Sequence, residues 1–141
     1  MKKLFLLVIF MTGALGLSRS QACTGITLQT IDSMTVTART IEWAAEPLNA
    51  MCVIVPKGQK QRSWLPDGTP LGKSFTAEYG YVGIAVENDE FIMEGINEAG
   101  LAAGLFYFPD YGEYLPYKEA DKSMCVSDMQ FVAWVLSTCA T

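Results

Sequence analysis

The hydrophobic and polar residues that follow residue 22 alternate mostly with the two-residue period of β-strands. Residues 24–30 alternate and are rich in Thr and Ile, residues 31–33 are suited to a turn, and residues 34–43 alternate again. Two alternating runs joined by a short turn predict a β-hairpin at this end of the chain.

The same pattern predicts further strands over 51–55, 79–86, 90–95 and 101–108. The last of these is an apolar run that we expect to be buried. Residues 59–74 are polar and contain Pro-Asp-Gly and Pro-Leu-Gly turns, so no strand is predicted there. Residues 97–100 form the sequence Asn-Glu-Ala-Gly, which predicts a tight turn with Gly100 at positive φ.

One helix is predicted, and it lies at the end of the sequence. Ser127 and Gln130 have the spacing of a capping box at its start. Apolar residues then recur at helical spacing on one face, at Met129, Val132, Ala133 and Leu136. No C-cap residue follows, and an apolar helix face needs a covering element. We therefore expect the sequence to be the N-terminal part of a longer protein.

The first 22 residues have the pattern of a secretory signal peptide rather than of a folded element. A short basic segment with Lys2 and Lys3 precedes an apolar run over 4–17, and small residues stand at Ser20 and Ala22. This pattern predicts cleavage before Cys23 and export to the periplasm or the extracellular space. The alternative is a lipoprotein signal with a lipid-anchored Cys23, although Ser20 stands where such signals normally have Leu.

Removal of the signal peptide changes the charge balance. It takes the basic residues Lys2, Lys3 and Arg19 from the 10 in the chain, which leaves 7 against 15 acidic residues and a net charge of −8. No basic stripe remains, so nucleic acid is not expected as a partner. The sequence contains no His, which excludes Ser-His-Asp and Cys-His catalysis and His-ligated metal sites within these residues. We expect no metal and no cofactor.

Cys23 is the candidate nucleophile, because signal cleavage would make it the first residue. Its thiol and its α-amino group would then belong to one residue, and both exchange protons near neutral pH. The amine can act as the general base toward the thiol and later as the general acid toward the leaving amine. A single residue would thus supply nucleophile and base without a histidine.

Two charged residues are candidates for supporting this chemistry. The hairpin brings the strand that contains Arg39 beside the strand that starts at Cys23, and a nearby cation favours a thiolate. Glu42 lies near the same strand end and could orient the ammonium group. The alternatives are a solvated strand residue for Arg39 and a surface carboxylate for Glu42, since most charged residues on strands are solvated.

The alternative for the cysteines is structural. Exported proteins commonly contain disulfides, and Cys23, Cys52, Cys125 and Cys139 could form two. In that case the chain would be a disulfide-bonded exported binding module rather than an enzyme.

These residues resemble a known family, the choloylglycine hydrolases, which comprise bile salt hydrolases and penicillin V acylases. The family starts its mature chain with Cys-Thr-Gly, as at Cys23, and has an Arg sixteen residues later, the spacing of Arg39. It usually has Asp three residues further on, where this chain has Glu42. A second match is the segment 94–101, Glu-Gly-Ile-Asn-Glu-Ala-Gly-Leu, which is similar to the family's Gly-Met-Asn-Glu-Lys-Gly-Leu turn.

The resemblance implies a fold and an activity. The fold is the α+β, N-terminal-nucleophile αββα sandwich, present here as mostly antiparallel strands plus one C-terminal helix, over residues 23–141. The activity is hydrolysis of linear amide bonds, with glycine- or taurine-conjugated bile salts as the first expectation and penicillin V or another N-acyl amide as the alternative. Family members are longer and often homotetrameric, and their second oxyanion Asn and a later catalytic Arg would lie beyond residue 141.

The resemblance also implies two substrate-side positions. In the strand after the second motif, the family has a residue whose backbone amide helps to bind the oxyanion, and Tyr107 aligns with it, with Phe106 one register away. Bile salt hydrolases often have Asn there and penicillin acylases often have Tyr. Ile41 is a candidate for lining an apolar substrate pocket. The alternatives are a half-buried strand aromatic for Tyr107 and a core residue for Ile41.

Overall fold

The computed structural model describes residues 23–42, 48–107 and 112–141. The predicted signal peptide, the end of the second predicted strand at Trp43, and Phe108 lie outside the described residues. The chain divides into two compact units, Met1–Ala44 and Ala45–Thr141, and each is described by itself. Among the described residues, no helix combines the length and the apolar character that crossing a membrane requires.

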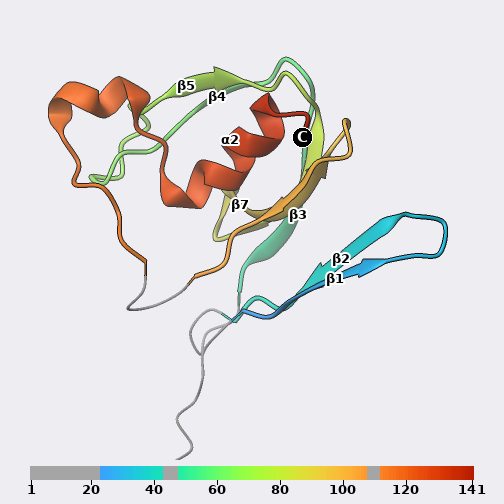
Figure 1. Cartoon of the computed structure of the whole chain (residues 1–141). Coiled ribbons are helices and arrows are strands. Elements are labelled where there is room, and N and C mark those ends of the chain that lie inside the picture. Colours follow the sequence, from blue (N-terminus) through green and yellow to red (C-terminus); the bar gives the residue numbers. More distant parts are fainter. Residues whose placement is uncertain (1–22, 43–47, 108–111) are drawn as a thin grey trace, which may run out of the picture. The chain divides into compact units, whose positions relative to one another are not determined.

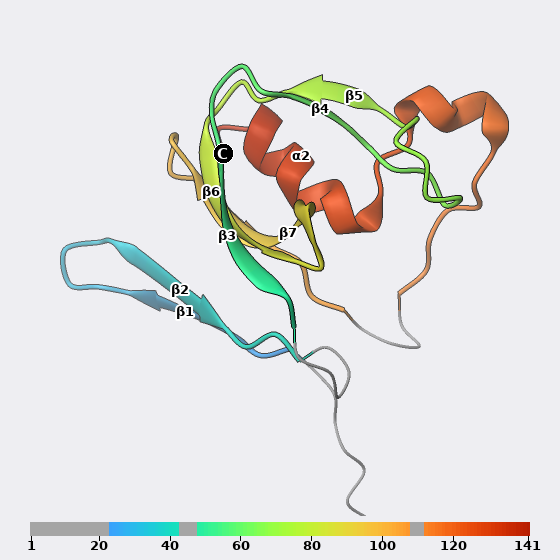
Figure 2. The same ribbon diagram turned by 180° about the vertical axis from the view of Figure 1, so that it is seen from behind.

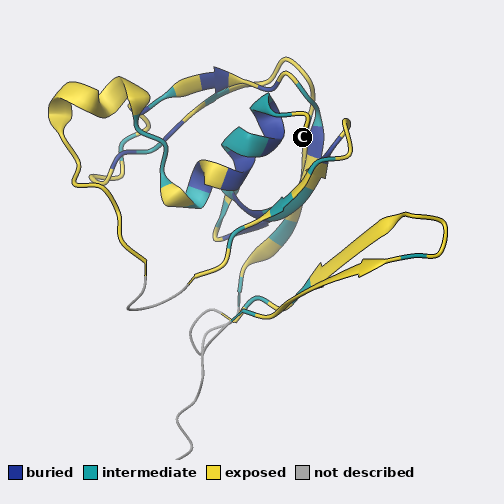
Figure 3. Cartoon of the chain, in the orientation of Figure 1, coloured by how far each residue is buried: buried dark blue, intermediate teal, exposed yellow. Residues whose placement is uncertain are grey.

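The first unit contains the predicted hairpin. Strand β1 (Gly25–Gln29) pairs antiparallel with β2 (Thr35–Arg39), so that Ile26 faces Ala38 and Leu28 faces Val36. These residues give the hairpin one apolar face, and most of the hairpin is exposed in Figure 3. In the turn, Ser33 has φ of 66°, and the Thr30 carbonyl accepts from its N–H at 3.0 Å. The prediction of this hairpin is confirmed.

The second unit is built on one antiparallel sheet with the strand order β3-β6-β7-β8. Its strands are β3 (Ala50–Val55), β6 (Tyr81–Val86), β7 (Asn88–Asn97) and β8 (Ala102–Gly104). All neighbouring strands are antiparallel, and a register irregularity interrupts the β6–β7 pairing near Ala85. All four strands fall on predicted ones, and alternation along β3, β6 and β7 produces the sheet's buried and exposed faces.

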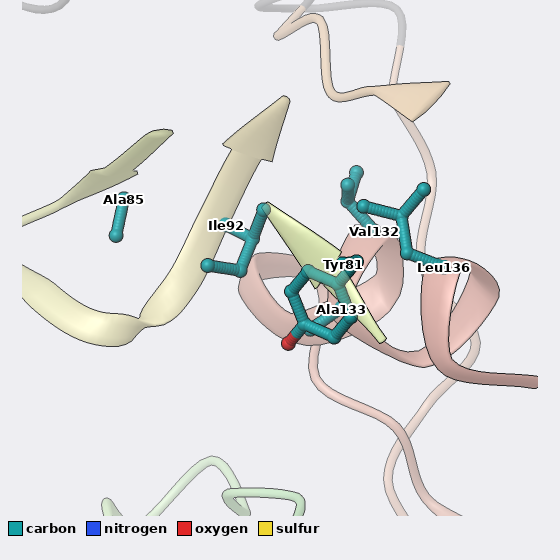
Figure 4. Close-up of a cluster of buried hydrophobic side chains, with 6 residues drawn as sticks. All are labelled: Tyr81, Ala85, Ile92, Val132, Ala133 and Leu136. Atoms are coloured by element: carbon teal, nitrogen blue, oxygen red, sulfur yellow. The ribbon is translucent and has the colours of Figure 1, made fainter. Parts of the chain in front are cut away.

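The helix α2 (Phe131–Thr138) covers one face of this sheet, as Figures 1 and 2 show from opposite sides. The core lies between helix and sheet. Its buried side chains, drawn in Figure 4, come from β6, β7 and α2: Tyr81, Ala85, Ile92, Val132, Ala133 and Leu136. The predicted apolar helix face is therefore confirmed, with Met129 only half-buried at its edge. Burial of such side chains is the main force that holds the unit together.

The prediction of a capping box at Ser127 and Gln130 is wrong. Ser127 precedes a short 3-10 turn, η2 (Asp128–Gln130), and makes no side-chain cap bond, and α2 begins only at Phe131. The Gln130 side chain is 1% exposed and points into the protein. Its carbonyl oxygen accepts from the backbone N–H of Trp64 at 2.7 Å, so it satisfies a buried group of a distant loop instead of a helix end.

The polar segment 59–74 contains structure that the sequence pattern did not predict. Strands β4 (Lys60–Arg62) and β5 (Ser74–Thr76) form a separate two-stranded sheet. Both are short and mostly polar, and only the central residues, Gln61 and Phe75, point inward. The segment before α2 also contains a 3-10 helix, η1 (Glu119–Met124), with no buried residue.

The turn between β7 and β8 is confirmed, with Gly100 at φ of 88°. The expectation of a long buried strand after it is wrong. Strand β8 has only three residues, lies at the edge of the sheet, and is exposed except for a half-buried Ala103. Within the described part of the chain, antiparallel strands plus one α-helix confirm the α+β class, while the sandwich stays a prediction.

Candidate active site

The hairpin places Cys23 just before β1, where its thiol is half-buried and free. Strand pairing continues past β1, because the Thr40 N–H donates to the Thr24 carbonyl at 2.9 Å. Side chains alternate between the two faces of a paired strand, so Cys23 shares a face with Gly25 and with Arg39, the residue opposite Gly25. The candidate nucleophile and the candidate cation thus belong to one face of the hairpin.

Arg39 is half-buried, and its Nε donates to the Thr40 carbonyl at 3.4 Å. Gly25 stands opposite, so the residue paired with Arg39 has no side chain. Diagonal neighbours across an antiparallel pair lie about 7–8 Å apart, within reach of a side chain as long as Arg. Partial burial and a backbone contact distinguish Arg39 from a fully solvated strand residue.

Glu42 is exposed, and its carboxylate accepts a hydrogen bond from the Thr40 hydroxyl at 3.2 Å. The same hydroxyl oxygen accepts from the Thr24 backbone N–H at 3.1 Å. Glu42 is thus connected, through one oxygen atom, to the peptide group that joins Cys23 to Thr24. Ile41 is half-buried beside it, at the register position that faces Cys23 when the pairing is extended from Gly25 and Arg39.

Tyr107 belongs to the second unit, so the structure describes it apart from the four hairpin residues. It lies after the end of β8, and the Leu105 N–H donates to the Met93 carbonyl at 2.7 Å, which prolongs the pairing with β7. Phe106 is 37% exposed and Tyr107 is 53% exposed, so neither is a core residue. The expectation of a half-buried strand aromatic does not hold for Tyr107.

All four cysteines are free thiols. Cys52 is exposed on the face of β3 that points away from α2, and Cys125 and Cys139 are half-buried. The two-disulfide alternative is therefore not what the structure contains. Within residues 23–42, 48–107 and 112–141, no group of three or more His, Cys, Asp or Glu residues could hold a metal ion.

The sequence pattern does not single out two residues that matter to the local geometry. Thr40 fits an alternating strand like its neighbours, although a Thr beside Arg39 and two residues before a carboxylate is a usable signal. Asn97 fits the pattern of a turn residue. Its side chain is buried and makes four hydrogen bonds, two of them to the end of α2 through the carbonyls of Leu136 and Cys139.

A shallow hollow of about 570 Å³ lies over the β4–β5 hairpin. Its lining includes Lys60, Arg62, Phe75 and Glu90 but none of the residues predicted to carry the chemistry. It is wide open to solvent, and the Glu90 carboxylate is already bonded to the Trp64 indole. We therefore do not assign it to the active site.

The comparisons with known proteins give one positive result. Residues 23–141 match the sequence model of a family described as "Linear amide C-N hydrolases, choloylglycine hydrolase family". The match starts at Cys23 and includes both compact units from there on. No curated protein and no solved structure matches the chain.

Proposed function

The chain belongs to the choloylglycine hydrolase family of linear amide C–N hydrolases, and from this membership we propose that Cys23, exposed by cleavage of a signal peptide, is the nucleophile that attacks the substrate amide. An exported location, periplasmic or extracellular, is part of the proposal, because the signal peptide that directs export is then removed, and its removal frees the α-amine of Cys23.

The reaction proceeds in two steps that share one intermediate. The thiol of Cys23 gives its proton to the α-amine, and the thiolate sulfur forms a bond to the amide carbon, which produces a tetrahedral oxyanion. Collapse of that intermediate breaks the C–N bond, and the ammonium group returns the proton to the leaving amine. Water then attacks the thioester, which releases the carboxylic acid and the free thiol. No cofactor is needed.

The observation that carries the proposal is the shared face of Cys23 and Arg39. In this role the guanidinium stabilises the thiolate, and the Glu42 carboxylate orients the ammonium group of the mature N-terminus. The backbone N–H at Tyr107 would donate to the oxyanion, which is where fixed donors contribute most to such reactions. Ile41, half-buried in the register position facing Cys23, would contact the apolar part of the substrate.

The proposed substrates are glycine- and taurine-conjugated bile salts, with penicillin V or another N-acyl amide as the alternative. The aromatic side chain at Tyr107 favours the alternative, because the resemblance to penicillin acylases rests on that residue. Measuring the turnover of a glycine conjugate, a taurine conjugate and penicillin V with one preparation of the full-length protein distinguishes the two substrate classes. Light scattering on the same preparation tests whether the protein is a homotetramer.

The central test is the state of the N-terminus. Cys23→Ala and Cys23→Ser are expected to abolish amide hydrolysis, and so is any residue retained before Cys23, because it converts the amine into an amide that cannot take up the proton. The control is Cys52→Ser, which changes an exposed thiol on another strand and should leave turnover unchanged. Full activity in a form that retains residues before Cys23 would refute the mechanism.

The non-enzyme alternative is a disulfide-bonded binding module, and the lipid-anchored form is a second alternative to free export. Peptide mapping under non-reducing conditions tests both alternatives, because the mass of the mature N-terminal peptide shows whether Cys23 carries a disulfide or a lipid. A free thiol with a free amine supports the hydrolase, whereas a disulfide or a lipid on Cys23 excludes it.

A further inference from the structure

The hydroxyl of Thr40 occupies the place of a backbone group in the pairing of the two hairpin strands. Thr24 and Thr40 face each other one position beyond the last paired residues, Gly25 and Arg39. In an ordinary antiparallel pair of this kind, each residue donates its N–H to the carbonyl of the other. Here the Thr40 N–H donates to the Thr24 carbonyl at 2.9 Å, but the Thr24 N–H donates to the Thr40 hydroxyl at 3.1 Å.

This exchange releases the Thr40 carbonyl from the pairing. The released oxygen accepts from Nε of Arg39 at 3.4 Å. The hydroxyl also has a hydrogen of its own to donate, and it donates to the Glu42 carboxylate at 3.2 Å. Through its hydroxyl, Thr40 therefore contacts the backbone next to Cys23 and the carboxylate of Glu42. Through its backbone carbonyl it contacts the guanidinium of Arg39.

The contact with the Thr24 N–H has a specific consequence for Cys23. That N–H belongs to the peptide group that joins Cys23 to Thr24, and this is the one peptide bond that Cys23 keeps when it becomes the first residue. Because the peptide group is planar, fixing its N–H fixes the carbonyl of Cys23 as well. The directions of the α-amine and of the thiol are then limited to the remaining rotations of one residue.

We propose that Thr40 is a positioning residue of the active site: its hydroxyl holds the Cys23–Thr24 peptide and the Glu42 carboxylate, and by replacing the Thr40 carbonyl in the strand pairing it leaves that carbonyl to the Arg39 guanidinium. This inference rests on the proposed function, in which Cys23 is the nucleophile. It assigns no proton transfer to Thr40. Its effect is on how well the amine, the thiol and the two charged groups are aligned before the substrate reacts.

Thr40→Val tests the role of the hydroxyl, because Val replaces it by a methyl group of similar size and has a high strand propensity, so the strand pairing of the hairpin is retained. Without the hydroxyl, the Thr24 N–H returns to the Thr40 carbonyl and competes with Arg39, and Glu42 loses its donor. Thr40→Ser keeps the hydroxyl. Thr37→Val is the matched control, since it makes the same change at an exposed position of β2, the strand that precedes Thr40.

Two readouts are taken on the mature full-length protein. In the first, kcat and KM are measured for a glycine-conjugated bile salt and for penicillin V. In the second, the rate at which iodoacetamide alkylates Cys23 is followed against pH by mass spectrometry of the N-terminal peptide. We expect Thr40→Val to lower kcat at least about tenfold, as loss of one hydrogen bond to a charged group would, with little change in KM. The pH profile of alkylation should shift as well.

Thr40→Ser should restore both readouts, and Thr37→Val should change neither. A Thr40→Val protein with the kcat and the alkylation profile of the wild type would overturn the assignment. A Thr40→Ser protein as impaired as Thr40→Val would also overturn it, because the methyl group rather than the hydroxyl would then carry the effect. Failure of the proposed function has a different signature, which is hydrolysis that survives Cys23→Ala, and the alkylation profile reports on Thr40 even then.

Discussion

Asn97 connects the β7–β8 turn to the end of helix α2, and replacing it by Asp tests whether this connection holds the second unit together. The side chain is 5% exposed. Its Nδ2 donates to the carbonyls of Leu136 at 3.0 Å and Cys139 at 2.7 Å, while Oδ1 accepts from the N–H groups of Ala99 at 3.1 Å and Leu101 at 3.0 Å. The side-chain amide therefore donates two hydrogen bonds and accepts two, which uses all of its hydrogen-bonding capacity.

Asn97→Asp keeps the acceptor toward the turn and removes both donors toward the helix. The new oxygen faces two carbonyl oxygens, which lose their partners. Each buried polar group left without a hydrogen bond costs about 1–3 kcal/mol, so we expect the free energy of unfolding to fall by about 3–5 kcal/mol. This is a large part of the total stability of a typical domain, about 5–15 kcal/mol.

The loss should depend on pH in a defined direction. Burial beside two carbonyls raises the pKa of the introduced carboxyl, because the protonated form can still donate one hydrogen bond. Below the unfolded pKa of about 3.9 the carboxyl is protonated in both states, so the deficit relative to wild type is smallest there. The deficit then grows as pH rises through the native pKa.

Urea unfolding followed by circular dichroism, at about pH 7 and about pH 4, measures both effects. The matched control is Asn88→Asp, because the Oδ1 of Asn88 accepts from the Glu90 N–H at 2.9 Å and an Asp can do the same. We expect the control to lose less than about 1 kcal/mol. The reasoning is refuted if Asn97→Asp is as stable as Asn88→Asp, or if its deficit does not change with pH.

Two further predictions concern other buried polar groups. Gln130→Leu leaves the Trp64 N–H without its acceptor and should cost about 2–4 kcal/mol in urea unfolding, while Gln59→Leu, at an exposed position, should cost much less. Burial raises the pKa of Tyr81 to about 12, with its hydroxyl bonded to Gln61 at 3.1 Å. Since the neutral phenol is favoured in the folded state, stability should be lost as pH rises from about 10 toward 12, and Tyr81→Phe should remove part of that loss; an unchanged pH dependence would count against it.

The strands that the sequence predicts best are those whose pairing depends only on residues close in the sequence. The alternating runs on either side of the Ser33 turn could pair only with each other at so short a separation, and the hairpin register follows from the turn. Gly100 marked the β7–β8 turn because its positive φ is accessible to glycine without strain. Because the hairpin register is local, the sequence also predicts that Arg39 pairs near Cys23.

The strands and contacts that were missed depend on residues far apart in the sequence. The strands β4 and β5 are polar and short, and they pair through Gln61 and Phe75 only because both residues pack inward. Gln130 lies where a capping residue is expected, but its side-chain oxygen accepts a hydrogen bond from the N–H of Trp64 instead. A buried N–H without a partner costs more than an exposed helix end without a cap, so the distant contact prevails over the local one.

What the sequence determined by itself is the cysteine that becomes the candidate nucleophile, the cation on the same hairpin face, and the family, because motif spacing and strand alternation act over a few residues. The tertiary structure decided what holds those pieces in place. Only the folded chain shows that the Thr40 hydroxyl replaces a backbone acceptor beside Cys23, and that Asn97 joins a turn to a helix about forty residues away. Asn97 is buried, and a buried polar group must find a partner inside the protein. In both cases the partner is decided by proximity in three dimensions, which the local pattern does not contain.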